Sequence, residues 1–218
     1  MNSEFIYFDI ETIPTQSDTV AAKLVENAKP PANYKSEDAI AKWREGKAAE
    51  SVAKTSFDGG RGHVCCISWA IDDLEIQHAM AMNLNDEASV VGSFFASLGQ
   101  FHSKTLVGHY INGFDIRFLT QRAIVLGVQL PPAHIWPRDP KPWDKGLADT
   151  MVMWAGAKGS ISMDNLCDIL GFPGKGDFDG SMVAEAWANG EHEKIAQYCR
   201  ADVARTRDIH RRFMDVGW

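Results

Sequence analysis

The run "FIYFDIETIP" near the amino terminus limits the possible folds of this chain more than any other stretch. Its apolar residues predict a buried strand over residues 4–10, close to two carboxylates, Asp9 and Glu11. Residues i and i+2 of a strand project from one face, so these carboxylates are expected side by side. Burying two like charges is costly unless a cation lies between them, and oxygen ligands favour a divalent metal. The alternative is a strand that simply ends in water, with Pro14 closing it.

Composition narrows the function classes. The 218 residues suffice for one substantial domain, and 45% hydrophobic with 23% charged residues is typical of a globular chain. The formal net charge of −7 argues against nonspecific coating of nucleic acid, but not against an enzyme that acts on it. The first residues lack the basic start of a secretory signal, and no apolar run approaches the ~20 residues of a membrane span. We therefore expect a cytoplasmic protein with no membrane partner.

The four cysteines show no paired C-x-x-C spacing, so neither a zinc site nor a disulfide framework is indicated. The order of the apolar runs, with three strands, then helix, strand, helix, strand and helices, predicts a mixed α/β fold. Further strands are expected at residues 63–71, 74–80 and 105–108, with a strand or helix start at 147–153. Helices are expected at residues 86–101, 114–126, 163–170, 182–189 and 191–214, the last with a break or kink near Asp202.

One segment, at about residues 15–60, does not fit this compact plan. It contains "SEDAIAKWREGKAAESVAKT", in which Ser36 can cap a helix that has only a thin apolar stripe. A loop of this length inside a domain is usually functional or mobile. We expect an inserted helical element beside the end of the first strand. Its lysines and arginines fit either a solvated helix face or contact with a polyanion.

Two later stretches carry further acids. In "VGHYINGFDIRFL", Asp115 lies at a helix start, where a carboxylate also suits the helix dipole. In "IAQYCRADVARTRDI", Tyr198 and Asp202 are four residues apart and share one face of a helix. Each stretch alone has an ordinary structural explanation, and together with Asp9 and Glu11 they form a more specific pattern.

In order and in local sequence, these three stretches resemble the exonuclease motifs of the DEDD superfamily. The likeness is closest to the proofreading exonuclease domain of family B DNA polymerases and its stand-alone relatives. It implies a ribonuclease H-like fold, with a central mixed five-stranded sheet flanked by helices. It also implies one exonuclease domain over residues 1–218, with the helical insertion within it. Tyr198 matches the tyrosine of the DEDDy branch, and Gln197 stands where the DEDDh branch has histidine.

The resemblance implies a metal site made of Asp9, Glu11, Asp115 and Asp202. Four hard carboxylates suit two Mg²⁺ or Mn²⁺ ions, and two ions about 4 Å apart can stabilise both the attacking and the leaving oxygen. By this likeness Asp9 bridges both ions, Glu11 and Asp202 hold the ion that activates water, and Asp115 is more distant. Tyr198 completes the catalytic set. Since a tyrosine pKa is normally near 10, it is expected to orient the water rather than act as a base.

Three residues beside these acids are candidates for contacting a strand end: Thr12, Asn112 and Phe114. A turn-forming hydroxyl also explains Thr12, and core packing also explains Phe114. A Pro-rich loop mixes aromatic and basic residues as strand-binding surfaces do, although such loops produce the mixture by chance as well; these residues are Trp136, Arg138, Lys141 and Trp143.

The implied function is a metal-dependent 3′-5′ exonuclease acting on single-stranded or frayed DNA, with a separate polymerase as a second partner. Two alternatives stay open: an exoribonuclease acting on RNA, and a catalytically silent nucleic-acid-binding domain. "DIET" also resembles the D-x-D-x-T motif of phosphotransferases, but Glu11 stands where that motif has Asp, and Tyr198 would then have no role.

Overall fold

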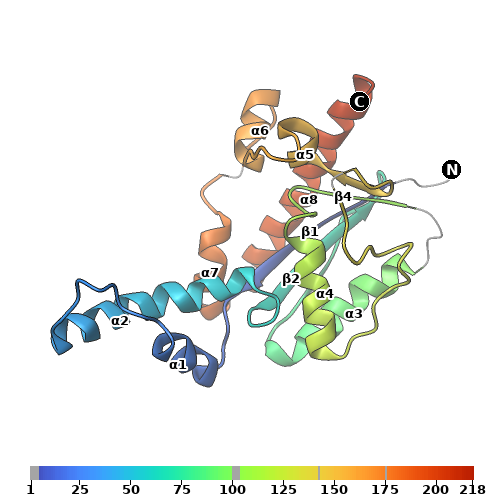
Figure 1. Cartoon of the computed structure of the whole chain (residues 1–218). Helices are drawn as coiled ribbons and strands as arrows, with labels where there is room; N and C mark the ends of the chain where they lie inside the picture. The colour runs from blue at the N-terminus through green and yellow to red at the C-terminus, as the bar shows by residue number, and fades with distance from the viewer. Residues whose placement is uncertain (1–4, 100–103, 142, 175) are drawn as a thin grey trace.

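The computed structural model describes residues 5–99, 104–141, 143–174 and 176–218, and a five-stranded sheet lies at its centre (Figure 1). The strand order is β3-β2-β1-β4-β5. The sheet is mixed, because β2 runs antiparallel to β1 and β3, whereas β4 and β5 run parallel to β1. The strands are β1 (Phe5–Ile13), β2 (His63–Ile71), β3 (Gln77–Met80), β4 (Thr105–Gly108) and β5 (Leu147–Asp149). The predicted mixed five-stranded sheet is confirmed.

Helices cover both faces of the sheet: α3 and α4 lie against one, and α8 crosses the other (Figure 1). The helices are α1 (Asp18–Glu26), α2 (Glu37–Ala53), α3 (Glu87–Leu98), α4 (Asp115–Leu126), α5 (Thr150–Ala155), α6 (Met163–Leu170), α7 (Val183–Ala188) and α8 (His192–Asp215), with 3₁₀ turns η1 (Lys54–Phe57), η2 (Leu84–Asp86) and η3 (Gly180–Met182). The segment 147–153 holds both a strand and a helix start. Helix α8 continues through Asp202 without the expected break, and the predicted helix end at residue 101 lies outside the described residues.

The side chains of β1 alternate between the two faces of the sheet, so that one set enters the apolar core and the other set faces α8. Ile6, Phe8 and Ile10 are buried in the main core with α3 and α4. The residues between them face α8, where the Tyr7 hydroxyl contacts Nδ1 of His210 at 3.1 Å. Asp9 therefore lies on the α8 face, as does Glu11, after which the register with β2 shifts between Glu11 and Thr12.

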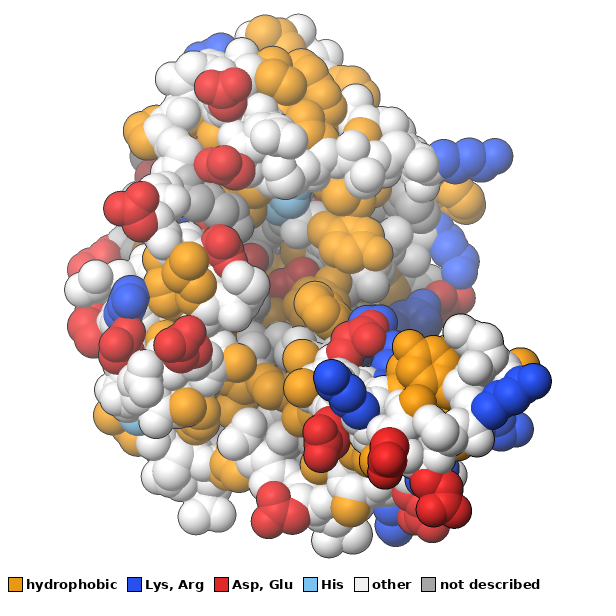
Figure 2. Space-filling model, turned by 90° about the vertical axis from the view of Figure 1, so that its left-hand side faces the viewer, with side chains coloured by type: hydrophobic (Ala, Val, Ile, Leu, Met, Phe, Trp, Pro, Cys, Tyr) orange, Lys and Arg blue, Asp and Glu red, His pale blue; other side chains and the backbone are white. Residues whose placement is uncertain are grey.

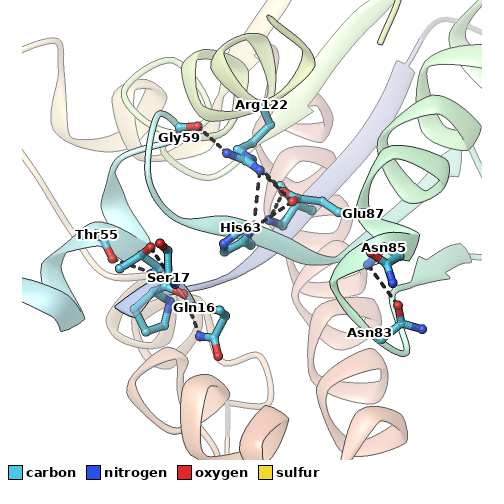
Figure 3. A network of polar contacts seen from close by, with 12 residues as sticks. Gln16, Ser17, Thr55, Gly59, His63, Asn83, Asn85, Glu87 and Arg122 are labelled. Carbon is cyan, nitrogen blue, oxygen red and sulfur yellow. Dashed lines mark hydrogen bonds and ion pairs between the residues drawn. The ribbon is translucent and has the colours of Figure 1, made fainter. Parts of the chain in front are cut away.

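A buried ion pair joins the two helices of the core face to β2 (Figure 3). The guanidinium of Arg122 on α4 donates from Nε and Nη2 to the carboxylate of Glu87 on α3, each at 2.7 Å. Glu87 also accepts from the Val64 backbone N–H at 2.8 Å and contacts His63 Nδ1 at 2.9 Å. Arg122 donates further to the carbonyl of Gly59 at 3.1 Å, which fixes the chain where the insertion returns to the sheet. Buried charges are tolerated only with partners of this kind.

The predicted helical insertion is confirmed as α1, α2 and η1, which extend from the body of the fold (Figure 1). Helix α1 begins at the Ser17 cap and α2 at the Ser36 cap, as expected from Ser36 in the sequence. Neither helix buries a residue, so they are held mainly by contact with each other. Lys47 and Lys54 both pair with Glu50. No helix in the described ranges is both long enough and apolar enough to span a membrane.

Candidate active site

The end of β1 brings two acids of the first motif against α8. Ligand atoms of Asp9, Glu11 and Cys199 all lie within 4.8 Å of one another. The Cys199 thiol donates to the Asp9 backbone carbonyl at 3.4 Å and lies 3.6 Å from its Oδ2. Burial, contact with Cys66 and the nearby carboxylates raise the pKa of Cys199, so its thiol keeps its proton. Cys199 is therefore a neutral hydrogen-bond donor that orients Asp9. No sign of this role is visible in the sequence, because the cysteines show no paired spacing.

Helix α8 carries the third motif into the same place. Tyr198 and Asp202 are 7% and 3% exposed, and the Tyr198 hydroxyl hydrogen-bonds the Asp202 carboxylate. Burial, followed by the charges of Asp202, Glu11 and Asp9, raises the pKa of Tyr198 well above its usual value. The ring packs edge-on against Phe178, with ring centroids 5.1 Å apart. Tyr198 is consequently a hydroxyl donor at every physiological pH.

Asp115 reaches β1 from the start of α4. Its side chain is 4% exposed, and it accepts a backbone hydrogen bond from Ile10, the residue between Asp9 and Glu11. Burial chiefly raises the pKa of Asp115 to about 7; the Asp149 charge adds to this, while hydrogen bonds from the Asp115 and Ile10 backbone oppose it. Asp115 thus holds a carboxylate that is costly to ionise beside the first pair of acids.

The loop before Asp115 is shaped by Asp149, the residue that precedes α5. Its carboxylate caps α5 by accepting hydrogen bonds from the backbone N–H groups of Met151 and Val152. It also accepts from the backbone N–H groups of Tyr110 at 2.9 Å and Asn112 at 3.1 Å. The sequence could not show this second role, because the two segments meet only through the parallel pairing of β4 and β5.

An arginine lies next to the acids. Arg205, three residues after Asp202 on α8, donates from Nη1 to Asp202 Oδ1 at 2.7 Å and from Nη2 to the Gly174 carbonyl at 2.8 Å. It ties the acid to the chain between α6 and η3. Only its place on the same face of the helix as Asp202 could have signalled this contact in the sequence.

The donor set fits hard divalent cations. Glu11, Asp115 and Asp202 are each less than 10% exposed, and Asp9 joins Glu11 within a ligand-sized space. Oxygen donors of like charge, gathered in a poorly solvated place, are the chemistry that Mg²⁺ and Mn²⁺ bind. Asp9, Glu11, Tyr198 and Asp202 are close enough to influence one another's charge, and Asp115 joins them through Ile10.

The structure divides the three predicted substrate-binding residues between two cavities. Thr12 and Phe114 line a cavity of about 530 Å³ that also contains Glu11. The Thr12 hydroxyl donates to the Ser56 carbonyl at 2.8 Å. Asn112 instead lines a separate space of about 160 Å³, and its Oδ1 is buried without a hydrogen-bond partner among the described residues.

The strand-binding interpretation of the Pro-rich loop is wrong for Trp136. This ring is fully buried in the main core, and its Nε1 donates to Thr120 Oγ1 at 2.9 Å. Arg138 is held by the backbone carbonyls of Pro131 and Trp136. An apolar ring that fills a core is stabilising wherever it lies in the chain, and sequence context gave no sign of its direction.

The face of the molecule that includes the insertion is hollowed near its centre (Figure 2). Acidic side chains lie deep in this hollow, and hydrophobic side chains gather along its walls. Such a recess, polar at the base and apolar at the sides, is typical of a ligand-binding site.

The fold is that of the ribonuclease H-like exonuclease domains. It matches the family B DNA polymerase from the hyperthermophilic archaeon Pyrobaculum calidifontis with a TM-score of 0.61 at 19% sequence identity. The match covers 97% of this chain and 24% of the polymerase, so the chain spans about a quarter of that protein. No curated protein matches the sequence significantly.

Residues 62–216 match the family described as predicted 3′-5′ exonucleases related to the exonuclease domain of PolB, and the chain belongs to this family. The matched segment contains Asp115, Tyr198 and Asp202, whereas Asp9 and Glu11 precede it. The expected likeness to the exonuclease domain of family B DNA polymerases is confirmed.

Proposed function

We propose that this protein is a metal-dependent 3′-5′ exonuclease that removes nucleotides from single-stranded or frayed DNA. The observation that supports this most strongly is the meeting of Glu11, Tyr198 and Asp202, which come from opposite ends of the chain, around one buried acidic cluster. Family membership points to the same reaction class.

Asp9, Glu11, Asp115 and Asp202 would hold two Mg²⁺ or Mn²⁺ ions. When bound, such ions lower the pKa of water and stabilise charge on the attacking and leaving oxygens of a phosphodiester. The chain's own groups then have separate tasks. Cys199 orients Asp9. Tyr198 keeps its proton and donates it to the Asp202 carboxylate, so its hydroxyl oxygen remains to accept a hydrogen bond from the water and thereby position it.

The substrate assignment rests on the recess beside Glu11, whose size suits one nucleotide unit better than a duplex end. RNA is the alternative substrate, because discrimination at the 2′ position depends on few contacts. The cytoplasmic setting and a separate polymerase partner stay predictions.

The test is digestion of single-stranded DNA and matched RNA, each labelled at the 5′ end, with Mg²⁺, Mn²⁺ or chelator. We expect a metal-dependent ladder that shortens from the 3′ end, with DNA cut faster than RNA. Asp202→Asn should abolish the ladder, whereas Asp208→Asn, which changes an exposed acid six residues further along α8, should not. Full activity in Asp202→Asn would refute the site, and faster RNA cleavage would reverse the substrate assignment.

A further inference from the structure

One wall of the cavity beside Glu11 is formed by the helical insertion, for which the sequence patterns indicate no definite function. Its lining comes from the end of β1, the start of α4, the η3–α7 segment and the carboxy-terminal end of the insertion. Among the residues that the insertion contributes is Phe57, whose side chain is 73% exposed. Single exposed apolar side chains are ordinary, but this one borders a cavity of about 530 Å³ that contains a candidate metal ligand.

The backbone that carries Phe57 is held firmly, in contrast to its exposed ring. The Ser56 carbonyl accepts from Thr12 Oγ1 at 2.8 Å, and Thr55 Oγ1 accepts from the Thr15 N–H at 2.7 Å. Thr55 is 3% exposed. Two contacts with the end of β1 thus fix the position of η1 relative to Glu11. An aromatic ring held in place before binding loses little conformational entropy when a ligand covers it.

Phe57 meets the ring of a second residue that lines the cavity, Phe114 at the start of α4. Its centroid lies 6.1 Å from that of Phe114, with the planes at 62°. Phe114 is in turn supported by Phe118 of the core, with centroids 5.3 Å apart. The two rings form an aromatic corner, defined here as Phe57 and Phe114, in which Phe114 is braced by the fold and Phe57 presents open surface.

We propose that the aromatic corner stacks the base of the 3′-terminal nucleotide, so that the insertion supplies a binding residue for the exonuclease substrate. This inference rests on the proposed function. A nucleobase is the occupant that fits, because it offers a flat apolar face to the rings while its attached phosphate lies toward the acidic cluster that includes Glu11. Stacking of this kind tolerates every base, since each has a π-face, so no base preference is expected.

The test compares two single-stranded oligonucleotides, one with a normal 3′-terminal nucleotide and one whose terminal nucleotide lacks its base. Binding is measured by fluorescence anisotropy with Mg²⁺ in an Asp202→Asn background, which separates binding from hydrolysis. We expect the normal end to bind about tenfold more tightly than the abasic end, in the range known for base–aromatic stacking. Adding Phe57→Ala should lower that ratio by weakening only the normal end, since Phe114 alone then faces the base, and Phe57→Trp should keep it.

The matched control is Trp218→Ala, which removes a similarly exposed aromatic ring (67%) that lines a different cavity near the carboxy terminus. It should leave the ratio unchanged. An equal ratio with and without Phe57→Ala would overturn the inference. Absence of 3′ shortening by the unsubstituted protein would instead overturn the proposed function, so the two failures are distinguishable. Circular dichroism of each variant establishes that the fold is retained.

Discussion

Replacing Asp115 with asparagine should stabilise the metal-free protein and at the same time stop hydrolysis. Burial raises the pKa of Asp115 from 3.8 to about 7, so the folded state binds this proton more tightly than the unfolded state does. A raised folded-state pKa gives a contribution to stability that is complete below about pH 4 and is lost as pH rises toward 7. Asparagine does not ionise, so Asp115→Asn does not lose this stability as the pH rises.

The size of the effect follows from the shift. Each pKa unit corresponds to 1.36 kcal/mol, so a change of roughly three units gives a difference of about 4 kcal/mol between low pH and pH 8. Between pH 5 and pH 8, where the assay is practical, the advantage of Asp115→Asn should grow by about 3 kcal/mol. Asparagine keeps an acceptor oxygen for the Ile10 backbone, so the local geometry is largely retained.

The assay is urea unfolding with chelator present, at several pH values from 5 to 8. Asp208→Asn, an exposed acid on α8, serves as the control and should show no such trend. Adding Mg²⁺ should stabilise the unsubstituted protein more than Asp115→Asn, because ligand binding to the folded state shifts the equilibrium. A difference between Asp115→Asn and the parent that is flat from pH 5 to pH 8 would refute the reasoning.

Three further changes test other parts of the site and its support. Tyr198→Phe should lower kcat about 10- to 100-fold with KM nearly unchanged, measured on single-stranded DNA, because a positioning hydrogen bond is lost; an unaltered kcat would contradict its role. Arg122→Met should lower the free energy of unfolding by about 3–5 kcal/mol, since Glu87 is left buried, and adding Glu87→Met should recover part of that loss in urea titrations. Asp149→Ala should reduce both the melting temperature and the exonuclease rate, because two loop N–H groups and the first turn of α5 lose their acceptor. A lower melting temperature with an unchanged rate would show that Asp149 does not contribute to the site.

Much of the fold could be predicted because the chain's local patterns agree with its tertiary structure. The apolar run of β1, the alternation that puts Asp9 and Glu11 on one face, and the helical spacing of Tyr198 and Asp202 are consequences of strand and helix geometry alone. Helix α6 begins and ends where its spacing predicts, at Met163 and Leu170. Such features need no knowledge of distant segments.

The supporting residues could not be predicted in this way. Cys199 and Asp149 make contacts that exist only after β1 has met α8 and β4 has paired with β5. Arg205 pairs with Asp202 within one helix, and only its bond to the Gly174 carbonyl depends on a distant segment. The direction of a side chain in a loop is likewise a tertiary property: Trp136 lies in the core although it belongs to a Pro-rich loop and Pro137 and Arg138 follow it.

The sequence by itself determined the order of strands and helices, the four acids with their tyrosine, and a helical insertion after the first strand. Only the tertiary structure decided that the end of this insertion, with Phe57, returns to the end of β1 and walls the cavity beside Glu11. The physical reason is range: periodicity and capping act between residues a few positions apart, whereas a cavity is formed by surfaces that packing brings together from far along the chain.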